Sequence, residues 1–213
     1  MRVTTLLSGG LDSAVLLAAL LEAEHQVEAL YVLPVSDSGG PMAERQAASA
    51  IARHFDVPIV YAEVSAGDAF VPPSLGGQAV LVPPAAAIAW DRAREGLAWA
   101  AHGGQAAPAV ALAQVLRVAL RVTAPRLEVV LPFLEHPKPG LVAIGATLGV
   151  PFDRTYSCEL GEPTHCGACL SCGERRAAFV AADVPDPTSY AVEPEALEGE
   201  DDDAGEESAQ ETP

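Results

Sequence analysis

The chain opens with a strand-like run, a glycine pair and a helix-like run, an order typical of a strand that feeds a helix through a tight loop. Arg2 to Leu7 is short, apolar and rich in Val, Thr and Leu. After the loop Ser8-Gly-Gly-Leu-Asp-Ser13, apolar residues recur at helical spacing through Leu21. The first elements are therefore predicted as strand, loop and helix.

The same alternation continues along the chain. Glu28–Leu33 and Ile59–Val64 are predicted as strands, and Ala43–Phe55 between them as a helix. Repeated βαβ units predict an α/β fold, a doubly wound parallel sheet with helices on both faces.

The middle of the chain is less regular because Gly and Pro are frequent there. Gln78–Val82, before Pro83 and Pro84, fits either a short fourth strand or the start of a helix. Further on, the pattern predicts two helices, a strand and a last helix, over Ala85–Ala101, Ala109–Val122, Leu127–Leu131 and Gly140–Leu148.

Charge separates the end of the chain from the rest. The 213 residues hold 29 acidic and 12 basic side chains, a net charge of −17, and ten acidic residues lie in 193–213 with no basic one. Residues 1–192 are predicted as one domain, and the acidic tail 193–213 as disordered. Because gripping phosphate backbones requires a basic face, we expect no nucleic-acid partner.

No apolar run reaches the ~20 residues of a membrane helix. Asp12 and Glu22 interrupt the most apolar stretch, and Gly9 and Gly10 break a possible signal peptide. We expect a cytoplasmic protein without membrane contact. In that reducing compartment, closely spaced cysteines favour metal binding over disulfides.

The glycine loop has the composition of an anion site. A helix N-terminus offers free N–H groups and a positive dipole end, and two glycines allow close approach to phosphate oxygens. Ser8 and Ser13 add hydroxyl donors, and Asp12 can hold Mg²⁺ or a ribose or base donor. A plain βα turn capped by Asp12 is the alternative. The spacing fits neither a P-loop nor a dinucleotide fingerprint.

Four cysteines lie close together near the other end, at Cys158, Cys166, Cys169 and Cys172. The C-x7-C-x2-C-x2-C spacing lets four thiolates converge on one ion, which predicts a structural zinc knuckle over 155–180. An iron–sulfur cluster is the rival interpretation, although no Cys-Pro follows. His165 is surplus to four ligands and is expected beside the site or at the surface.

Together, the glycine loop and the cysteine knuckle resemble the 7-cyano-7-deazaguanine synthase family of queuosine biosynthesis. Thr155-Tyr-Ser-Cys158, His165-Cys-Gly167, Glu174-Arg-Arg-Ala-Ala-Phe179 and Pro185-Asp-Pro-Thr-Ser-Tyr190 extend the resemblance. It implies a fold of the adenine nucleotide alpha hydrolase-like, PP-loop type, a homodimer, and an ATP-dependent ligase. Such a ligase joins 7-carboxy-7-deazaguanine and ammonia to give 7-cyano-7-deazaguanine.

The resemblance also implies the site residues. Asp12, Ser13 and Lys138, the only lysine, are the catalytic candidates, and Lys138 is expected to stabilise phosphate charge unless it is simply solvated. The residues expected to bind ATP with Mg²⁺ are Leu7, Ser8, Gly9, Gly10, Leu11, Asp12, Ser13, Ala14, Val15, Leu16 and Leu17. Arg175 or Arg176 could reach phosphate, but paired arginines more often solvate a helix face or bridge a dimer.

The sequence departs from the family on the substrate side. Val35-Ser-Asp-Ser-Gly-Gly40 stands where the family has Tyr-Gly-Gln, Val82-Pro-Pro-Ala-Ala86 where it has Val-Pro-Gly-Arg-Asn, and Trp90-Asp-Arg92 where it has Tyr-Pro-Asp-Cys-Arg. An adenylating enzyme for another carboxylate and a zinc-stabilised nucleotide-binding module are therefore alternatives. Trp90 and Trp99, placed on one helix by the pattern, either stack a purine or pack a core.

Overall fold

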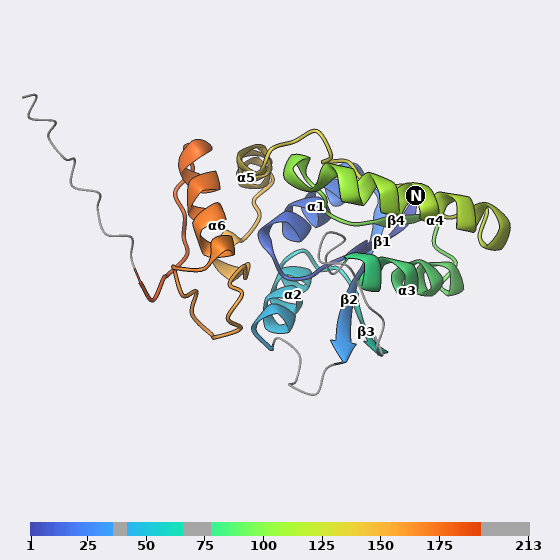
Figure 1. Ribbon diagram of the computed structural model, residues 1–213, viewed down its shortest axis with the longest axis horizontal. Helices are drawn as coiled ribbons and strands as arrows, with labels where there is room; N and C mark the ends of the chain where they lie inside the picture. Colours follow the sequence, from blue (N-terminus) through green and yellow to red (C-terminus); the bar gives the residue numbers. More distant parts are fainter. Residues whose placement is uncertain (36–41, 66–77, 193–213) are drawn as a thin grey trace, which may run out of the picture.

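The computed structural model describes residues 1–35, 42–65 and 78–192 (Figure 1). Within these ranges the strands form one parallel sheet of five, in the order β3-β2-β1-β4-β5. The predicted doubly wound α/β fold is confirmed. The strands are β1 (Arg2–Leu6), β2 (Gln26–Val35), β3 (Ile59–Ser65), β4 (Gly96–Ala98) and β5 (Glu128–Val130).

Helices cover both faces of this sheet. They are α1 (Leu11–Glu22), α2 (Met42–His54), α3 (Gln78–Asp91), α4 (Ala106–Thr123), α5 (Lys138–Thr147) and α6 (Leu170–Ala181). Short 3-10 turns lie at Gly103–Gln105 and Phe152–Arg154. The sheet order reverses at β1, which pairs with β2 on one side and β4 on the other. In open α/β sheets, ligands bind at such a reversal, outside the carboxyl ends of the strands.

The two cores follow from the alternation of side chains along each strand. On β2, Ala29 and Tyr31 join the core under α1, α2, α5 and α6, whereas Leu30 and Val32 join the core under α3 and α4. In Figure 1 the helices α3 and α4 lie together on one side of the sheet. Both faces of the central strands are thus buried, as a parallel sheet requires.

Helix α5 packs against α1, and α6 in turn packs against α5. Gly145 on α5 lets this happen, because an added Cβ would meet Val15 of α1 at 2.7 Å and Phe152 at 2.6 Å. Phe152 in turn packs edge-on against Phe179 of α6, with ring centroids 5.0 Å apart. The N-terminal and C-terminal parts of the chain therefore share one core.

The middle of the chain differs from the prediction. Gln78–Val82 is the start of helix α3 and not a strand, because Pro83 and Pro84 are carried inside the helix and do not end it. The helix predicted over Ala85–Ala101 is wrong after Asp91, since the fourth strand lies at Gly96–Ala98. Ala93, in the left-handed conformation at φ 53°, turns the chain between them.

Two expectations from the sequence fall on segments outside the described ranges, and a third concerns membrane crossing. The acidic tail and the segment Ser36–Gly40 lie outside the described residues. Within the part of the chain that the structure describes, none of the helices is both long and apolar enough to cross a bilayer.

Ion pairs to the buried carboxylate of Glu28 fix the loop that leads from α3 into β4. Glu28, on β2, is 3% exposed and accepts hydrogen bonds from Arg92 Nε at 2.6 Å and from Arg94 Nη2 at 2.7 Å. The hydrogen bond and charge of Arg92, together with Arg94, outweigh burial and hold the pKa of Glu28 below its ordinary 4.5. This carboxylate therefore compensates two arginine charges beside the sheet.

Glu28→Gln is expected to lower the free energy of unfolding by about 1–3 kcal/mol at neutral pH, because Arg92 and Arg94 lose their charged acceptor. The folded-state pKa is lowered, so the stabilisation is complete above 4.5 and is lost as the pH falls toward the folded-state value. Urea unfolding at neutral and acid pH measures both effects. Glu95→Gln, which breaks only the exposed pair with Arg2, is the control and should cost less. An equal loss at both pH values would contradict the role of this carboxylate.

Candidate active site and metal centre

The glycine loop lies at the carboxyl end of β1, at the point where the sheet order reverses. Gly9 has φ 88°, and a Cβ there would meet the Glu44 carbonyl oxygen and, at 2.8 Å, the Ala48 nitrogen. Only glycine satisfies both the left-handed conformation and this approach to the α2 backbone. The loop is therefore held tightly against α2.

Hydroxyl groups hold the rest of the loop. Ser8 Oγ accepts from the Gly10 N–H at 3.3 Å and lies 3.1 Å from Ser13 Oγ, which donates to the Gly10 carbonyl at 3.0 Å. Gly10 is the N-cap of α1, and no side chain caps the helix. The first N–H groups of α1 thus remain available to an anion, as the sequence predicted.

Asp12 lies in the first turn of α1, and one of its carboxylate oxygens has no hydrogen-bond partner among the described residues. Its Oδ1 is buried and has no hydrogen-bond partner among the described residues. Its Oδ2 lies 3.8 Å from His102 Nε2, and the Gly104 N–H donates to His102 Nδ1 at 3.3 Å. Because the backbone bond fixes Nδ1 as acceptor, the Nε2 proton faces Asp12. An unpartnered carboxylate oxygen of this kind fits a Mg²⁺ ligand.

A cavity of about 330 Å³ opens beside the loop. Residues of β1, α3 and the end of β4 form the apolar part of its lining. The glycine loop forms its base, and α5, α6 and the segment before the cysteines form the polar part. The lining residues are Leu6, Ser8, Gly10, Leu11, Asp12, Ser13, Leu81, Val82, Trp99, Ala100, Lys138, Tyr156, Ser157, Ser171 and Glu174. A volume of this size is ordinary for a small-molecule site.

Lys138 begins α5 and faces the same cavity. Its Nζ lies 3.3 Å from Glu174 Oε2 on α6, and the Lys138 side chain is 18% exposed. The alternative of a simply solvated lysine is wrong, because the side chain is mostly buried at the cavity wall.

Several ATP-binding candidates do not line the cavity. Leu7, Ala14, Val15, Leu16 and Leu17 are buried in the hydrophobic core beneath the loop, and Gly9 faces α2. The structure brings Ser8, Gly10, Leu11, Asp12, Ser13 and Lys138 together at the cavity. Glu174 and Ser157 were missed as site residues, because their place depends on how α6 and the segment before the cysteines pack against the loop.

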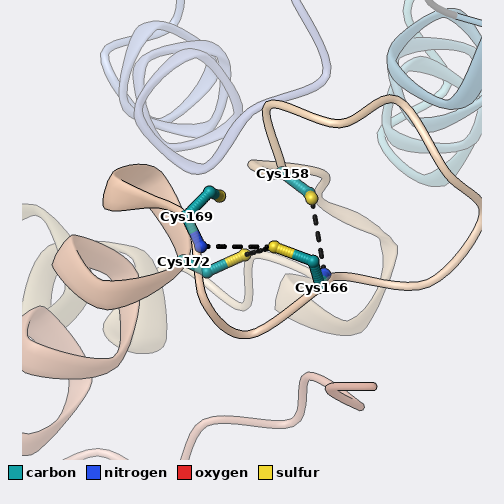
Figure 2. A group of neighbouring side chains, drawn as sticks. All are labelled: Cys158, Cys166, Cys169 and Cys172. Carbon is teal, nitrogen blue, oxygen red and sulfur yellow. Dashed lines mark hydrogen bonds between the residues drawn. The ribbon is translucent and has the colours of Figure 1, made fainter. Parts of the chain in front are cut away.

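The four cysteines converge as their spacing predicted (Figure 2). Their sulfur atoms all lie within 4.8 Å of one another, and Cys166 Sγ and Cys172 Sγ are 4.0 Å apart. Four thiolates around one zinc ion with Zn–S bonds of about 2.3 Å would stand about 3.8 Å apart. These residues can therefore hold a single metal ion.

Backbone N–H groups donate hydrogen bonds to the cysteine sulfurs, which favours the thiolate form that a metal ion binds. The N–H groups of Ala168 and Cys169 donate to Cys166 Sγ at 3.4 and 3.3 Å, and that of Cys166 donates to Cys158 Sγ at 3.4 Å. Burial raises the pKa of Cys169, but hydrogen bonds from backbone and neighbouring thiols bring it to about 7. Burial and the adjacent sulfurs raise the pKa of Cys172 to about 12. Crowded thiolates of this kind are stabilised by a shared metal ion.

His165 and Arg175 hold the knuckle in place from inside. His165 is buried, and its Nε2 accepts the Ser157 N–H at 3.0 Å. Arg175 is completely buried and donates to the Thr188 and Thr155 hydroxyls at 2.7 and 2.8 Å. Because Arg175 is completely buried, none of its three expected roles is correct: phosphate contact, a solvated helix face or a bridge across a dimer.

The tryptophans also differ from expectation. Trp99 follows β4, is 2% exposed and lines the cavity, whereas Trp90 lies on α3 and is 42% exposed. They share no helix, so the hypothesis that the two rings together stack a purine is wrong; Trp99 packs in the core beside α3 and α4.

The fold and the cysteine site together define a class of protein. A five-stranded parallel sheet with a glycine loop at its reversal and a C-terminal cysteine knuckle is an α/β architecture like that of the PP-loop type. Its backbone is similar to the structure of the U34-tRNA thiolase NcsA from Methanococcus maripaludis with its 4Fe-4S cluster, with TM-score 0.53 and 15% identity, over 86% of this chain and 66% of the other.

Sequence relatives then give the family. The family model "Queuosine biosynthesis protein QueC" matches residues 108–183. A 7-cyano-7-deazaguanine synthase from Allorhizobium ampelinum is 32% identical over 84% of this chain and 75% of its own length. A 7-cyano-7-deazaguanine synthase from Brucella anthropi is 32% identical over 89% of this chain and 94% of its own length. The chain belongs to the 7-cyano-7-deazaguanine synthase family.

On the expectation that this loop binds ATP, Gly9→Ala should weaken that binding at least about tenfold and lower the melting temperature, because the new Cβ collides with the α2 backbone at a positive φ. Gly149→Ala is the matched control, since Gly149 also has a positive φ of 68° but lies outside the cavity, and its Cβ would meet nothing within 4 Å. Calorimetric titration with ATP and Mg²⁺ compares the two. Equal affinities for both variants would show that the Gly9 conformation is not what holds the loop.

Proposed function

We propose that this chain is an ATP-dependent ligase that makes 7-cyano-7-deazaguanine from 7-carboxy-7-deazaguanine and ammonia. Membership of the family is the observation that carries this proposal. The cavity supports it independently, because it joins an anion-binding loop, a lysine and an unpartnered carboxylate oxygen in one small site.

The chemistry requires two activations by ATP. In the first, a carboxylate oxygen becomes a phosphorylated leaving group, and ammonia displaces it to give an amide. In the second, the amide oxygen is phosphorylated, and its departure with loss of two protons leaves the nitrile. Each step transfers negative charge to phosphate, so the catalyst must hold phosphate and neutralise it.

The residues of the cavity fit these tasks. The N–H groups at the start of α1 and the Ser8 and Ser13 hydroxyls would bind phosphate oxygens. Asp12 Oδ1, which lacks a partner, would hold Mg²⁺ bound to the phosphates. Lys138 would turn to the charge that develops on the transferred group.

We infer that the cysteines hold zinc in a structural role. One ion requires all four sulfurs to stand close together, whereas the separate irons of a cluster hold the cysteines farther apart, and the sulfurs lie within 4.8 Å. Four thiolates close the coordination sphere, so this ion would brace the loop and not touch substrate.

We also infer a homodimer that binds small molecules and not nucleic acid. Val115, Val118 and Val122 form an exposed apolar stripe on α4, which a second chain could cover. The net charge of −17 opposes binding to nucleic acid.

One equivalent of zinc per chain is expected by elemental analysis of protein purified without chelators. Cys172→Ser should lose that ion and lower the melting temperature by several degrees, because structural zinc contributes directly to folding. Ser171→Ala, at a neighbouring hydroxyl that is no metal ligand, should retain it. Iron with acid-labile sulfide in place of zinc would contradict the assignment.

Incubation with ATP, Mg²⁺, ammonium and 7-carboxy-7-deazaguanine is expected to yield the nitrile by mass spectrometry. Asp12→Asn and Lys138→Met should lower the rate about 100-fold or more, because each removes a charge used on the phosphates. Glu135→Gln, at an exposed carboxylate near Lys138, is the control and should retain activity. ATP turnover without amide or nitrile would favour another carboxylate, and intact ATP a binding module.

A further inference from the structure

The cavity contains a second carboxylate that phosphate handling does not explain. Glu174 lies on α6 and lines the same wall as Lys138 and the glycine loop. A carboxylate close to a triphosphate costs free energy through repulsion between like charges. A side chain of this kind in an ATP site is expected to serve a cation.

An ammonium group already occupies this carboxylate. Lys138 Nζ donates to Glu174 Oε2 at 3.3 Å, and both side chains reach into the cavity from different helices. The contact is long and Glu174 is 50% exposed, so the pair is weak and can exchange partners. The lysine head therefore marks a position in which an N–H cation is stable.

Phosphate in the site would release this position. Lys138 is at the first residue of α5, within the same cavity as the loop that would hold ATP. A phosphoryl group carries more charge than one carboxylate and attracts the lysine toward the loop. Glu174 is then left without its cation beside the reacting group.

A small polar surface surrounds Glu174 on the side of the knuckle. Ser171 lies three residues earlier on the same face of α6 and also lines the cavity. Its hydroxyl donates to Glu159 Oε1 at 2.6 Å, which leaves its lone pairs able to accept. An ion with four N–H donors finds a carboxylate and a hydroxyl oxygen there.

We propose that Glu174 binds the ammonium ion that supplies nitrogen to the reaction, after Lys138 has moved to phosphate. This inference rests on the proposed function and adds the subsite of its second substrate. The bound ammonium releases one proton to water at the open mouth of the cavity. The resulting ammonia uses its lone pair to form the C–N bond, and the C–O bond breaks with its electrons leaving on the phosphorylated oxygen. The newly bonded nitrogen then gives a second proton to water, which leaves the neutral amide.

The test compares a charged nucleophile with a neutral one. Hydroxylamine is largely uncharged at a pH where ammonia is almost entirely protonated, and it captures the same activated carboxylate as a hydroxamate. For Glu174→Gln, the KM for ammonium should rise about tenfold or more, as expected for loss of a charge-assisted hydrogen bond. The KM for hydroxylamine and for ATP should stay within about twofold.

Two further variants serve as controls for the effect of Glu174→Gln. Glu162→Gln removes an exposed carboxylate of the knuckle loop outside the cavity, and its KM for ammonium should not change. Glu174→Asp keeps the charge on a shorter side chain and should give an intermediate KM. Hydroxamate formation by Glu174→Gln itself shows that the variant is folded and able to activate the carboxylate.

The outcomes separate the two proposals. An unchanged KM for ammonium in Glu174→Gln, or an equal rise for ammonium and hydroxylamine, would overturn the ammonium subsite while the ligase assignment stands. If wild-type protein forms neither amide nor hydroxamate from 7-carboxy-7-deazaguanine, the proposed function itself fails.

Discussion

A backbone hydrogen bond joins the glycine loop to the segment that precedes the cysteines. The Tyr156 N–H donates to the Gly9 carbonyl at 2.8 Å, so the segment that leads into the cysteines holds the loop that begins α1. The Tyr156 ring packs with Cys158, Cys172 and Ala47 of α2, which also fixes Gly9 from its other side. The geometry of the glycine loop therefore depends on a part of the chain about 150 positions away.

The charges of the site are arranged around this junction. Asp12 and Lys138 begin two helices that pack against each other, and Glu174 comes from a third helix whose start is held by the cysteine loop. Each charged side chain thus lies on a separate rigid element. When substrate binds, these side chains can change their partners without movement of the backbone. The proposed transfer of Lys138 from carboxylate to phosphate requires only rotation of its side chain.

The sequence predicted the parallel sheet, the glycine loop and the four converging cysteines, because these depend on local patterns and fixed spacing. It did not predict where α3 ends, since Ala93 adopts a conformation for which glycine is the usual signal. The proline pair also suggested a break that the helix accommodates. Trp99 and Glu174 could not be assigned to the cavity, because only tertiary packing brings β4 and α6 to the loop.

Arg175 has a consequence for how the molecule opens. Its guanidinium binds the Phe152 carbonyl, the Thr155 hydroxyl and the Thr188 hydroxyl with no access to solvent. Neither the segment 152–155 nor the segment around Thr188 can detach without leaving this buried cation short of hydrogen-bond partners. Partial unfolding near the knuckle should therefore occur as a single cooperative event, with amide protons on both sides of α6 exchanging at one shared rate.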